Sequence, residues 1–125
     1  MPKNPKLSEA EQEIMAIIWG EDHSLTSNFI MDHLTGRTWA LSTVMTALAR
    51  LCRKGFVHCD RTTRTNYYTA ALTREEYRER ESREFLEKMH DNSVAGMIAA
   101  LDNSGAISDE DAAELRRILD RDLKR

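Results

Sequence analysis

Residues 39 to 56, WALSTVMTALARLCRKGF, restrict the fold of this chain more than any other stretch. At helical spacing the stretch has one apolar face, made by Val44, Leu48, Leu51 and Cys52. The opposite face carries hydroxyls and then cations, at Thr43, Thr46, Arg50 and Lys54. An outer helix face usually mixes charges of both signs, but this helix contains no acid. The stretch therefore predicts an amphipathic helix, with Ser42 as its N-cap and Gly55 at its end, whose outer face suits a negatively charged partner.

Charge is segregated along the chain, although the net charge is only −3. Residues 7–36 contain six acids and no Lys or Arg, whereas residues 37–68 contain six bases and one acid. Residues 73–125 return to an acidic excess, with ten bases and fourteen acids. A concentrated basic segment can bind a polyanion on a protein that is acidic overall, because affinity follows the local field. The basic segment contains the helix at 42–55, which supports the interpretation of its outer face.

Capping and turn signals predict the elements around this helix. Ser8 and Glu11 form a capping box for a first helix that ends at Gly20. After a short extended link, Thr26 is the N-cap of a second helix, which turns Ile30 and Leu34 inward and ends at Gly36. Residues 56–61 and 66–72 alternate like two half-buried strands around a polar turn at 62–65. The predicted class is mainly α with a small β-hairpin, in the order of a winged helix-turn-helix.

Three more helices are expected in the tail. A capping box at Thr73 and Glu76 starts a long charged helix that reaches about His90, and a short helix follows at 93–101. Residues 102–105 break the chain, and Ser108 starts the last helix. We expect a winged-helix DNA-binding domain at residues 1–72 and a helical dimerisation region at 73–125.

The apolar faces of the tail are too thin to bury one another within about fifty residues. Packing against a second copy of the tail would cover them in a two-fold dimer. The alternative is that the tail folds back on its own domain. The residues expected in the dimer contact are Tyr77, Phe85, Leu86, Met89, Met97, Ile98, Leu101, Leu115, Ile118 and Leu119.

The outer face of the helix at 42–55 fits the major groove of DNA. Hydroxyls near the helix N-terminus can bond to base edges, and threonine methyls can contact thymine methyls. Cations further along the helix suit phosphates, and arginines of a wing at 56–72 suit the backbone or the minor groove. Met45, beside this face, is either a gap-filling apolar residue or a further contact for thymine methyls. The expected DNA-binding residues are Ser42, Thr43, Thr46, Arg50, Arg53, Lys54, Arg61 and Arg64.

Three blocks of sequence carry a family resemblance. They are Leu7-Ser8-x-Ala10-Glu11-x-x-Ile14-Met15-x-x-Ile18-Trp19, Trp39-x-x-Ser42-Thr43-Val44-x-Thr46-x-Leu48-x-Arg50-Leu51-x-x-Lys54-Gly55, and Arg64-x-x-x-Tyr68. With Phe85-Leu86 and residues 114–119 of the tail, they resemble the penicillinase repressor and methicillin-resistance repressor family. The resemblance implies a homodimeric winged-helix repressor on a palindromic double-stranded DNA operator. It also implies that Ser42, Thr43, Thr46, Arg50 and Lys54 contact DNA from the recognition helix and Arg64 from the wing, while Trp39 packs ahead of the helix.

The resemblance leaves the inducing signal open. The β-lactam-sensing members of the family are cleaved at an Asn-Phe bond in the tail, where this chain has Ala100-Leu101. The related copper-responsive repressors carry Cys-x-Cys motifs near the C-terminus, and residues 73–125 contain no cysteine. The family wing often has Gly where this chain has Thr63. Relief of repression by a membrane sensor protease and relief by an unidentified ligand both remain open.

Other classes of function have weaker support. The sequence has no Gly-rich phosphate loop, no serine nucleophile elbow and no HExxH motif, so we expect no enzyme and no cofactor. A metal-responsive regulator would use Cys52, Cys59 and His58, with His23 or His33 as a further ligand. Both cysteines take apolar positions, so no metal site is expected. A winged helix that docks a protein instead of DNA is the stronger alternative, and a pI near 5.8 fits it.

The chain is expected to act in the cytoplasm. No apolar run approaches the ~20 residues needed to cross a bilayer, so no membrane insertion is expected. The start of the chain, MPKNPKLSEAEQE, has no apolar signal core.

Overall fold

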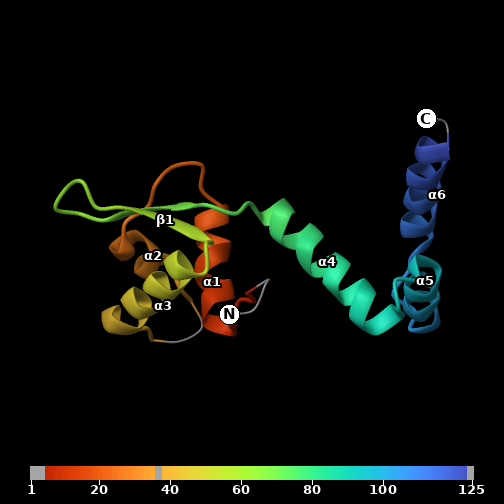
Figure 1. Ribbon diagram of the computed structural model, residues 1–125, viewed down its shortest axis with the longest axis horizontal. Helices are drawn as coiled ribbons and strands as arrows, with labels where there is room; N and C mark the ends of the chain where they lie inside the picture. The colour runs from red at the N-terminus through yellow and green to blue at the C-terminus, as the bar shows by residue number, and fades with distance from the viewer. Residues whose placement is uncertain (1–4, 36–37, 124–125) are drawn as a thin grey trace. The chain divides into compact units, whose positions relative to one another are not determined.

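The computed structural model describes residues 5–35 and 38–123 (Figure 1). The elements in chain order are α1 (Glu9–Trp19), α2 (Ser27–His33), α3 (Leu41–Arg53), β1 (Val57–Asp60), β2 (Tyr67–Ala70), α4 (Arg74–His90), α5 (Val94–Asn103) and α6 (Asp109–Leu123). The predicted class, mainly α with a small hairpin, is confirmed. The chain divides into two compact units, Met1–Arg80 and Glu81–Arg125, so α4 begins in the first unit and continues into the second. This division lies eight residues after the expected boundary at 72/73.

The first unit has a core shared by α1, α2, α3 and the hairpin. β1 and β2 pair antiparallel, with Val57 opposite Ala70 and Asp60 opposite Tyr67. Leu25 extends the sheet by one residue, because its amide and carbonyl bond to the carbonyl and amide of Tyr68 at 2.9 and 2.7 Å. Fully buried side chains come from each part of this unit: Ile14, Met15, Leu25, Ile30, Val44, Leu48, Leu51 and Phe56.

The predicted caps of α1, α2 and α4 are confirmed. The Glu11 amide donates to Ser8 Oγ at 3.2 Å, and Glu11 Oε1 accepts from the Ser8 amide at 2.8 Å. Thr26 Oγ1 accepts from the Phe29 amide at 3.1 Å at the start of α2. Thr73 and Glu76 form the same reciprocal pair before α4. α2 ends at His33, with Leu34 as its C-cap, so the helix stops before its expected end at Gly36, which itself lies outside the described residues.

The prediction that Ser42 caps the third helix is wrong. The N-cap is Ala40, which makes no side-chain capping bond, and α3 spans Leu41–Arg53. Trp39 and Val44 take the two positions that flank a helix start in a hydrophobic staple, and both are buried in the core. Packing of apolar side chains therefore sets this helix start. Ser42 is left exposed in the first turn of α3.

Gly55 ends α3 by turning the chain back into β1. Its φ of +84° lies in the left-handed region, which other residues seldom adopt. Its amide donates to the Cys52 carbonyl at 3.2 Å, and the Phe56 amide donates to the Leu51 carbonyl at 2.9 Å. This is a Schellman motif, and it places the buried Phe56 directly under the end of the helix.

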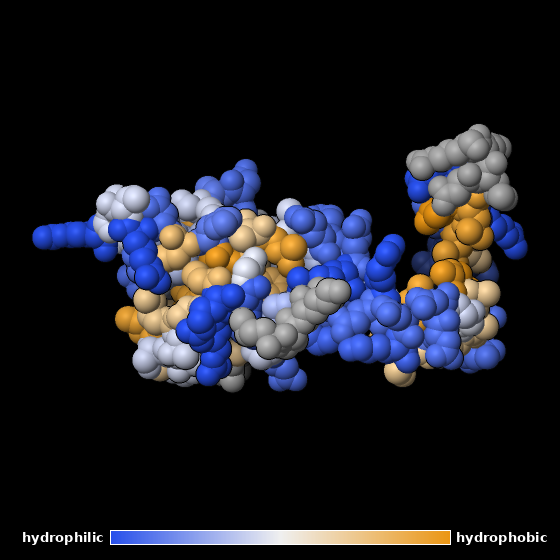
Figure 2. Space-filling model, viewed as in Figure 1, coloured by the Kyte–Doolittle hydropathy of each residue, from blue (hydrophilic) through white to orange (hydrophobic). Residues whose placement is uncertain are grey.

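The second unit has no residue that is buried, over the part of it whose side chains are described, 81–121. Asp91 and Asn92, both with positive φ, make the turn from α4 to α5, and Gly105 with φ +78° ends the next helix. α5 reaches Asn103, two residues beyond its expected end, and Ser108 begins the capping of α6 as predicted. Figure 2 shows apolar side chains (orange) at the surface of this unit. No helix in the described ranges has the length and apolar character to cross a membrane.

Candidate nucleic-acid interface

The outer face of α3 is exposed as the sequence predicts. Val44, Ala47, Leu48 and Leu51 are buried against the core. The expected contact residues Ser42, Thr43, Thr46, Arg50 and Arg53 are all exposed. No acid occurs between Leu41 and Arg53. The helix therefore presents hydroxyls in its first two turns and cations in its last two, with no carboxylate of its own to repel a phosphate.

A shallow groove runs between α3 and the start of α1. It is lined by Ser8, Ala10, Glu11, Ser42, Thr43, Thr46, Ala47 and Arg50. Three hydroxyl side chains of α3 therefore border a depression of the surface. The only acid in its lining, Glu11, is buried, with 2% of its surface exposed.

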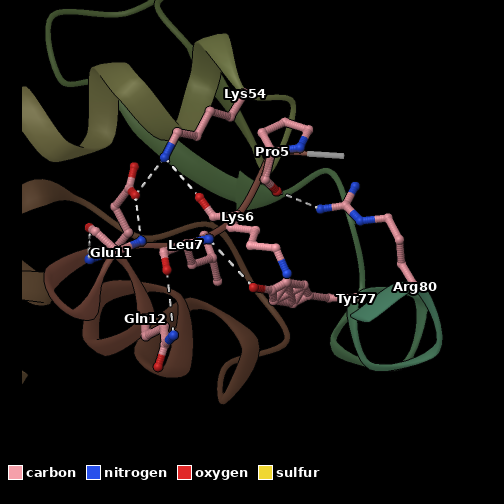
Figure 3. A network of polar contacts seen from close by, with 9 residues as sticks. Pro5, Lys6, Leu7, Glu11, Gln12, Lys54, Tyr77 and Arg80 are labelled. Atoms are coloured by element: carbon pink, nitrogen blue, oxygen red, sulfur yellow. Dashed lines mark hydrogen bonds and ion pairs between the residues drawn. The ribbon is translucent and has the colours of Figure 1, made fainter. Parts of the chain in front are cut away.

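Lys54 forms an ion pair with this buried acid (Figure 3). Its ammonium lies 2.7 Å from Glu11 Oε1 and donates to the Lys6 carbonyl at 3.0 Å. Burial by itself would raise the pKa of Glu11, but hydrogen bonds from Lys54 and Ser8 outweigh it, so the pKa is lowered and the carboxylate stays ionised. Lys54, expected at the DNA backbone, forms this ion pair while 28% of its own side chain stays exposed.

The wing places its two arginines differently. Arg61 Nε donates to Cys59 Sγ at 3.4 Å, which turns this side chain back along β1. Arg64 lies in the turn between the strands and is exposed. The Thr62 amide and hydroxyl both donate to Asp60, at 2.9 and 2.7 Å, and these bonds lower the pKa of that carboxyl. The turn is thus ordered by its own polar side chains, with Thr63 Oγ1 donating to the Thr65 carbonyl at 2.8 Å.

Cys52 and Cys59 are half-buried free thiols. Burial and the neighbouring Cys59 thiol raise the pKa of Cys52, so this thiol is protonated at neutral pH. Within the described ranges, no group of three or more His, Cys, Asp or Glu side chains is arranged to hold a metal ion.

Tyr77 packs on the core of the first unit rather than standing free for a dimer contact. Its ring centroid lies 5.8 Å from that of Trp19 and 5.4 Å from that of Phe56. Its hydroxyl accepts from the Leu7 amide at 3.4 Å. The sequence signal was present, since Leu72 and Tyr77 flank a capping box, but the partners of this ring come from α1 and from the residue before β1.

Sequence reasoning missed the role of residues 5–7. Figure 3 shows this segment lying between α3 and the start of α4. Arg80 donates to the Pro5 carbonyl at 2.8 Å, and its guanidinium lies 5.3 Å from the ring centroid of Phe56 and 5.5 Å from that of Tyr77. The first turns of α4 are therefore fixed to the first unit. An arginine within a charged helix carries no signal of such a contact.

The remaining residues expected in the dimer contact all lie in the second unit. Phe85, Met89, Leu101, Ile118 and Leu119 are exposed, and Leu86, Met97, Ile98 and Leu115 are half-buried. Phe85 is 47% exposed and Met89 is 65% exposed, which is unusual for large apolar side chains on one helix face. Within residues 81–121, whose side chains are described, the second unit therefore does not fully cover its own apolar side chains.

Comparison with known proteins identifies the family. The sequence profile described as penicillinase repressor matches residues 7–121. The chain belongs to the penicillinase repressor family. The penicillinase repressor of Bacillus licheniformis is 30% identical over 125 residues, covering 100% of this chain and 98% of that protein. The methicillin resistance regulatory protein MecI of Mammaliicoccus sciuri is 25% identical over 119 residues, covering 95% and 97%. The expected family resemblance is confirmed.

The fold of the first unit has a solved counterpart within the repressor family. The solution structure of the DNA-binding domain of the repressor BlaI aligns with 62% of this chain and 94% of that domain. The TM-score is 0.52 and the sequence identity is 33%. The predicted winged-helix fold is confirmed. The family is one of transcriptional repressors, which is not a class of enzymes.

Proposed function

We propose that this protein is a DNA-binding transcriptional repressor that reads its operator with α3. The observation that carries the proposal is the outer face of α3, which is exposed, free of acids, and lined first with hydroxyls and then with cations. Its position on a winged helix similar to the DNA-binding domain of the repressor BlaI supports the same reading. A helix of this kind fits the major groove, where each base pair presents a distinct pattern of donors and acceptors.

Each side chain of the face has a proposed task. Ser42, Thr43 and Thr46 lie in the first two turns, where hydroxyls reach base edges. Arg50 and Arg53 lie one to two turns further on and contact phosphates. Arg64 extends the contact from the wing to the backbone or the minor groove. Lys54 supports the interface indirectly, because it neutralises the buried Glu11 beneath the groove.

We further propose that two copies pair through the second unit. No residue of this unit between 81 and 121 is buried in one chain, and its exposed apolar side chains occur on α4, α5 and α6. A two-fold dimer would cover them. It would set two α3 helices on half-sites about 34 Å apart, one turn of DNA, or a multiple of that distance. The operator would then be palindromic, and repression would follow from blocking a promoter in the cytoplasm.

The signal that relieves repression is a separate matter. By analogy with the family, relief comes from cleavage of the tail by a membrane sensor protease or from a ligand. Residues 100–101 are Ala-Leu within α5, so a sensor protease acting there would need to open a helix and accept a different bond from Asn-Phe.

Binding to DNA from upstream of its own gene tests the proposal. The fluorescence anisotropy of a labelled duplex should rise on adding the full-length protein, with a scrambled duplex as the control. Affinity should fall steeply with salt, with a log–log slope of about −0.9 for each phosphate neutralised. DNA binding would be rejected by two results together. The first is weak, equal or salt-insensitive binding to both duplexes, and the second is failure to recover any sequence by in vitro selection from random DNA. These results would favour a winged helix that docks a protein.

A further inference from the structure

Two exposed apolar side chains on α3 have no role in the contacts assigned above. Leu41 is 49% exposed and Met45 is 36% exposed. In the described part of the first unit, one other large apolar side chain is exposed, that of Tyr67 on the wing. Single exposed apolar residues are ordinary on a protein surface. Two of them, one helical turn apart on the proposed reading helix, call for a physical reason.

Neither helix formation nor the core requires these residue types. Alanine, glutamate and lysine form helices as well as leucine and methionine do, and they leave no apolar surface in water. The buried face of α3 is made by Val44, Ala47, Leu48 and Leu51, so the core contact is complete without the two exposed residues. The apolar surface of Leu41 and Met45 is therefore available to a partner.

Their place on the helix identifies the kind of partner. Leu41 and Met45 lie about 40° apart around the helix axis and about 6 Å apart along it, so they form one short strip. The strip borders the exposed hydroxyls of Ser42 and Thr46, and it belongs to the first two turns, which enter the groove first. In the major groove, the apolar group that a base pair offers is the C5-methyl of thymine.

We propose that Leu41 and Met45 are specificity-determining residues that read thymine C5-methyl groups in the major groove. The proposal rests on the proposed function, since it names what one strip of the DNA-reading face recognises. A rise of about 6 Å along the helix spans about two base steps of 3.4 Å, so the two side chains meet thymines about two base pairs apart. The flexible thioether of Met45 suits a methyl group whose position varies with local DNA shape.

Replacing thymine by deoxyuridine tests the proposal, because it removes only the methyl group and keeps the base pair. The full-length protein first selects its operator from random duplex DNA. Each thymine of the selected half-site is then replaced singly, and dissociation constants are compared by anisotropy. We expect one or two positions, about two base pairs apart, where the wild-type protein loses about three- to five-fold in affinity, as burial of one methyl group implies.

Three variants assign the methyl contacts to side chains. Met45→Ala and Leu41→Ala should each bind the thymine duplex more weakly and should each lose the response to deoxyuridine at one position. Ser42→Ala is the matched control, because Ser42 is exposed on the same face and has a hydroxyl but no methyl group. This variant should lower affinity while keeping the full response at both positions. Circular dichroism checks that each variant is folded, which is expected because both target side chains are exposed. The deoxyuridine series on the wild-type protein does not depend on any variant.

The possible results separate the two proposals. A methyl response that disappears in the Leu41 or Met45 variant supports the strip as a thymine reader. Sequence-specific binding without any response to deoxyuridine overturns the assignment and leaves DNA binding intact. A response that stays unchanged at every position in both variants does the same. Failure to select any sequence overturns the assignment together with DNA binding itself, and would point to a protein partner for this apolar strip.

Discussion

Thr46 lies near the middle of the exposed arc of α3, one turn after Ser42. Its side chain lines the groove beside α1, so loss of its hydroxyl should remove a proposed base contact and leave the proposed phosphate contacts in place. Thr46→Ala should weaken binding to the selected operator by about 1–3 kcal/mol and leave binding to random DNA nearly unchanged. Anisotropy on the two duplexes checks this, and equal losses on both would remove Thr46 from base reading.

Lys54 and Glu11 form a pair in which one partner is buried and the other half-exposed. Lys54→Met should destabilise the fold by about 1–3 kcal/mol, because it leaves a buried carboxylate without its cation. The double variant Glu11→Gln, Lys54→Met should recover part of this loss. Urea denaturation measures both effects. A phosphate contact by Lys54 would instead reduce the salt slope of DNA binding by about 0.9, and we expect no such change.

The lowered pKa of Glu11 also predicts how stability depends on pH. A carboxyl group whose pKa is lower in the folded state contributes stability that is fully present above its ordinary value of 4.5. This contribution is lost as the pH falls through the folded pKa, because the group must then be protonated. Between about pH 6 and pH 3, the wild-type protein should lose more stability than Glu11→Gln. Parallel curves for the two proteins would show that Glu11 has the same pKa folded and unfolded.

At the scale of elements, the turn from α3 into β1 depends on Gly55. Apart from Gly55 and its two chain neighbours, no atom of the described residues lies within 4 Å of where a Cβ would be, so a side chain fits. The φ of +84° is nevertheless strained for other residue types. Gly55→Ala should therefore destabilise the first unit by about 1–2 kcal/mol. Gly55→Asn is the matched control and should cost less, since Asn tolerates the left-handed region better. Thermal unfolding measures the loss of stability in both variants. An equal loss in the two variants would mean that backbone strain is not its cause.

The wing is the second element whose contribution to DNA binding can be tested separately. Arg64 is exposed in the turn, whereas Arg61 is bonded to Cys59 within the hairpin. Arg64→Ala should weaken binding about equally on all sequences and reduce the salt slope by about 1, as expected for a lost phosphate contact. Arg61→Ala should change the slope less. A larger change for Arg61 would show that its bond to the thiol is given up on DNA.

At the scale of the whole molecule, the two units differ in how many of their side chains are buried. The first unit has its own buried core, while the second has no buried residue between 81 and 121. Leu101→Asp should therefore convert a dimer into a monomer, because it places a charge among the apolar side chains of α5. Ala99→Asp is the matched control on the opposite side of the same helix. Sedimentation equilibrium checks both variants, and a dimer that survives Leu101→Asp would exclude this face from the contact.

The position of a truncation distinguishes the two units as well. A chain ending at Arg80 keeps Tyr77 on Trp19 and Phe56 and keeps the bond from Arg80 to Pro5. A chain ending at Leu72 loses both. We expect the longer piece to be a folded monomer that binds a half-site, and the shorter piece to be less stable by about 3–5 kcal/mol, as loss of a large packed aromatic side chain implies. Equal stability of the two pieces would remove α4 from the first unit.

The sequence by itself determined the elements, the apolar faces and the family. Periodicity, capping boxes and the charge pattern are local signals, and each depends on residues within a few positions of one another. The outer face of α3, the caps at Ser8, Thr26 and Thr73, and the hairpin were all predictable for this reason.

Only the tertiary structure decided which side chains contact one another and which contacts prevail over the local sequence signals. Ser42 is the kind of residue that caps a helix, but burial of Trp39 and Val44 moved the start of α3 to Leu41. Lys54 carried the signal of a DNA-backbone contact, yet its nearest acid is Glu11, 43 residues earlier in the chain. Tyr77 and Arg80 read as part of the tail and pack on the first unit. For Lys54, Tyr77 and Arg80 the partner lies far away in the chain, where sequence spacing does not reveal it.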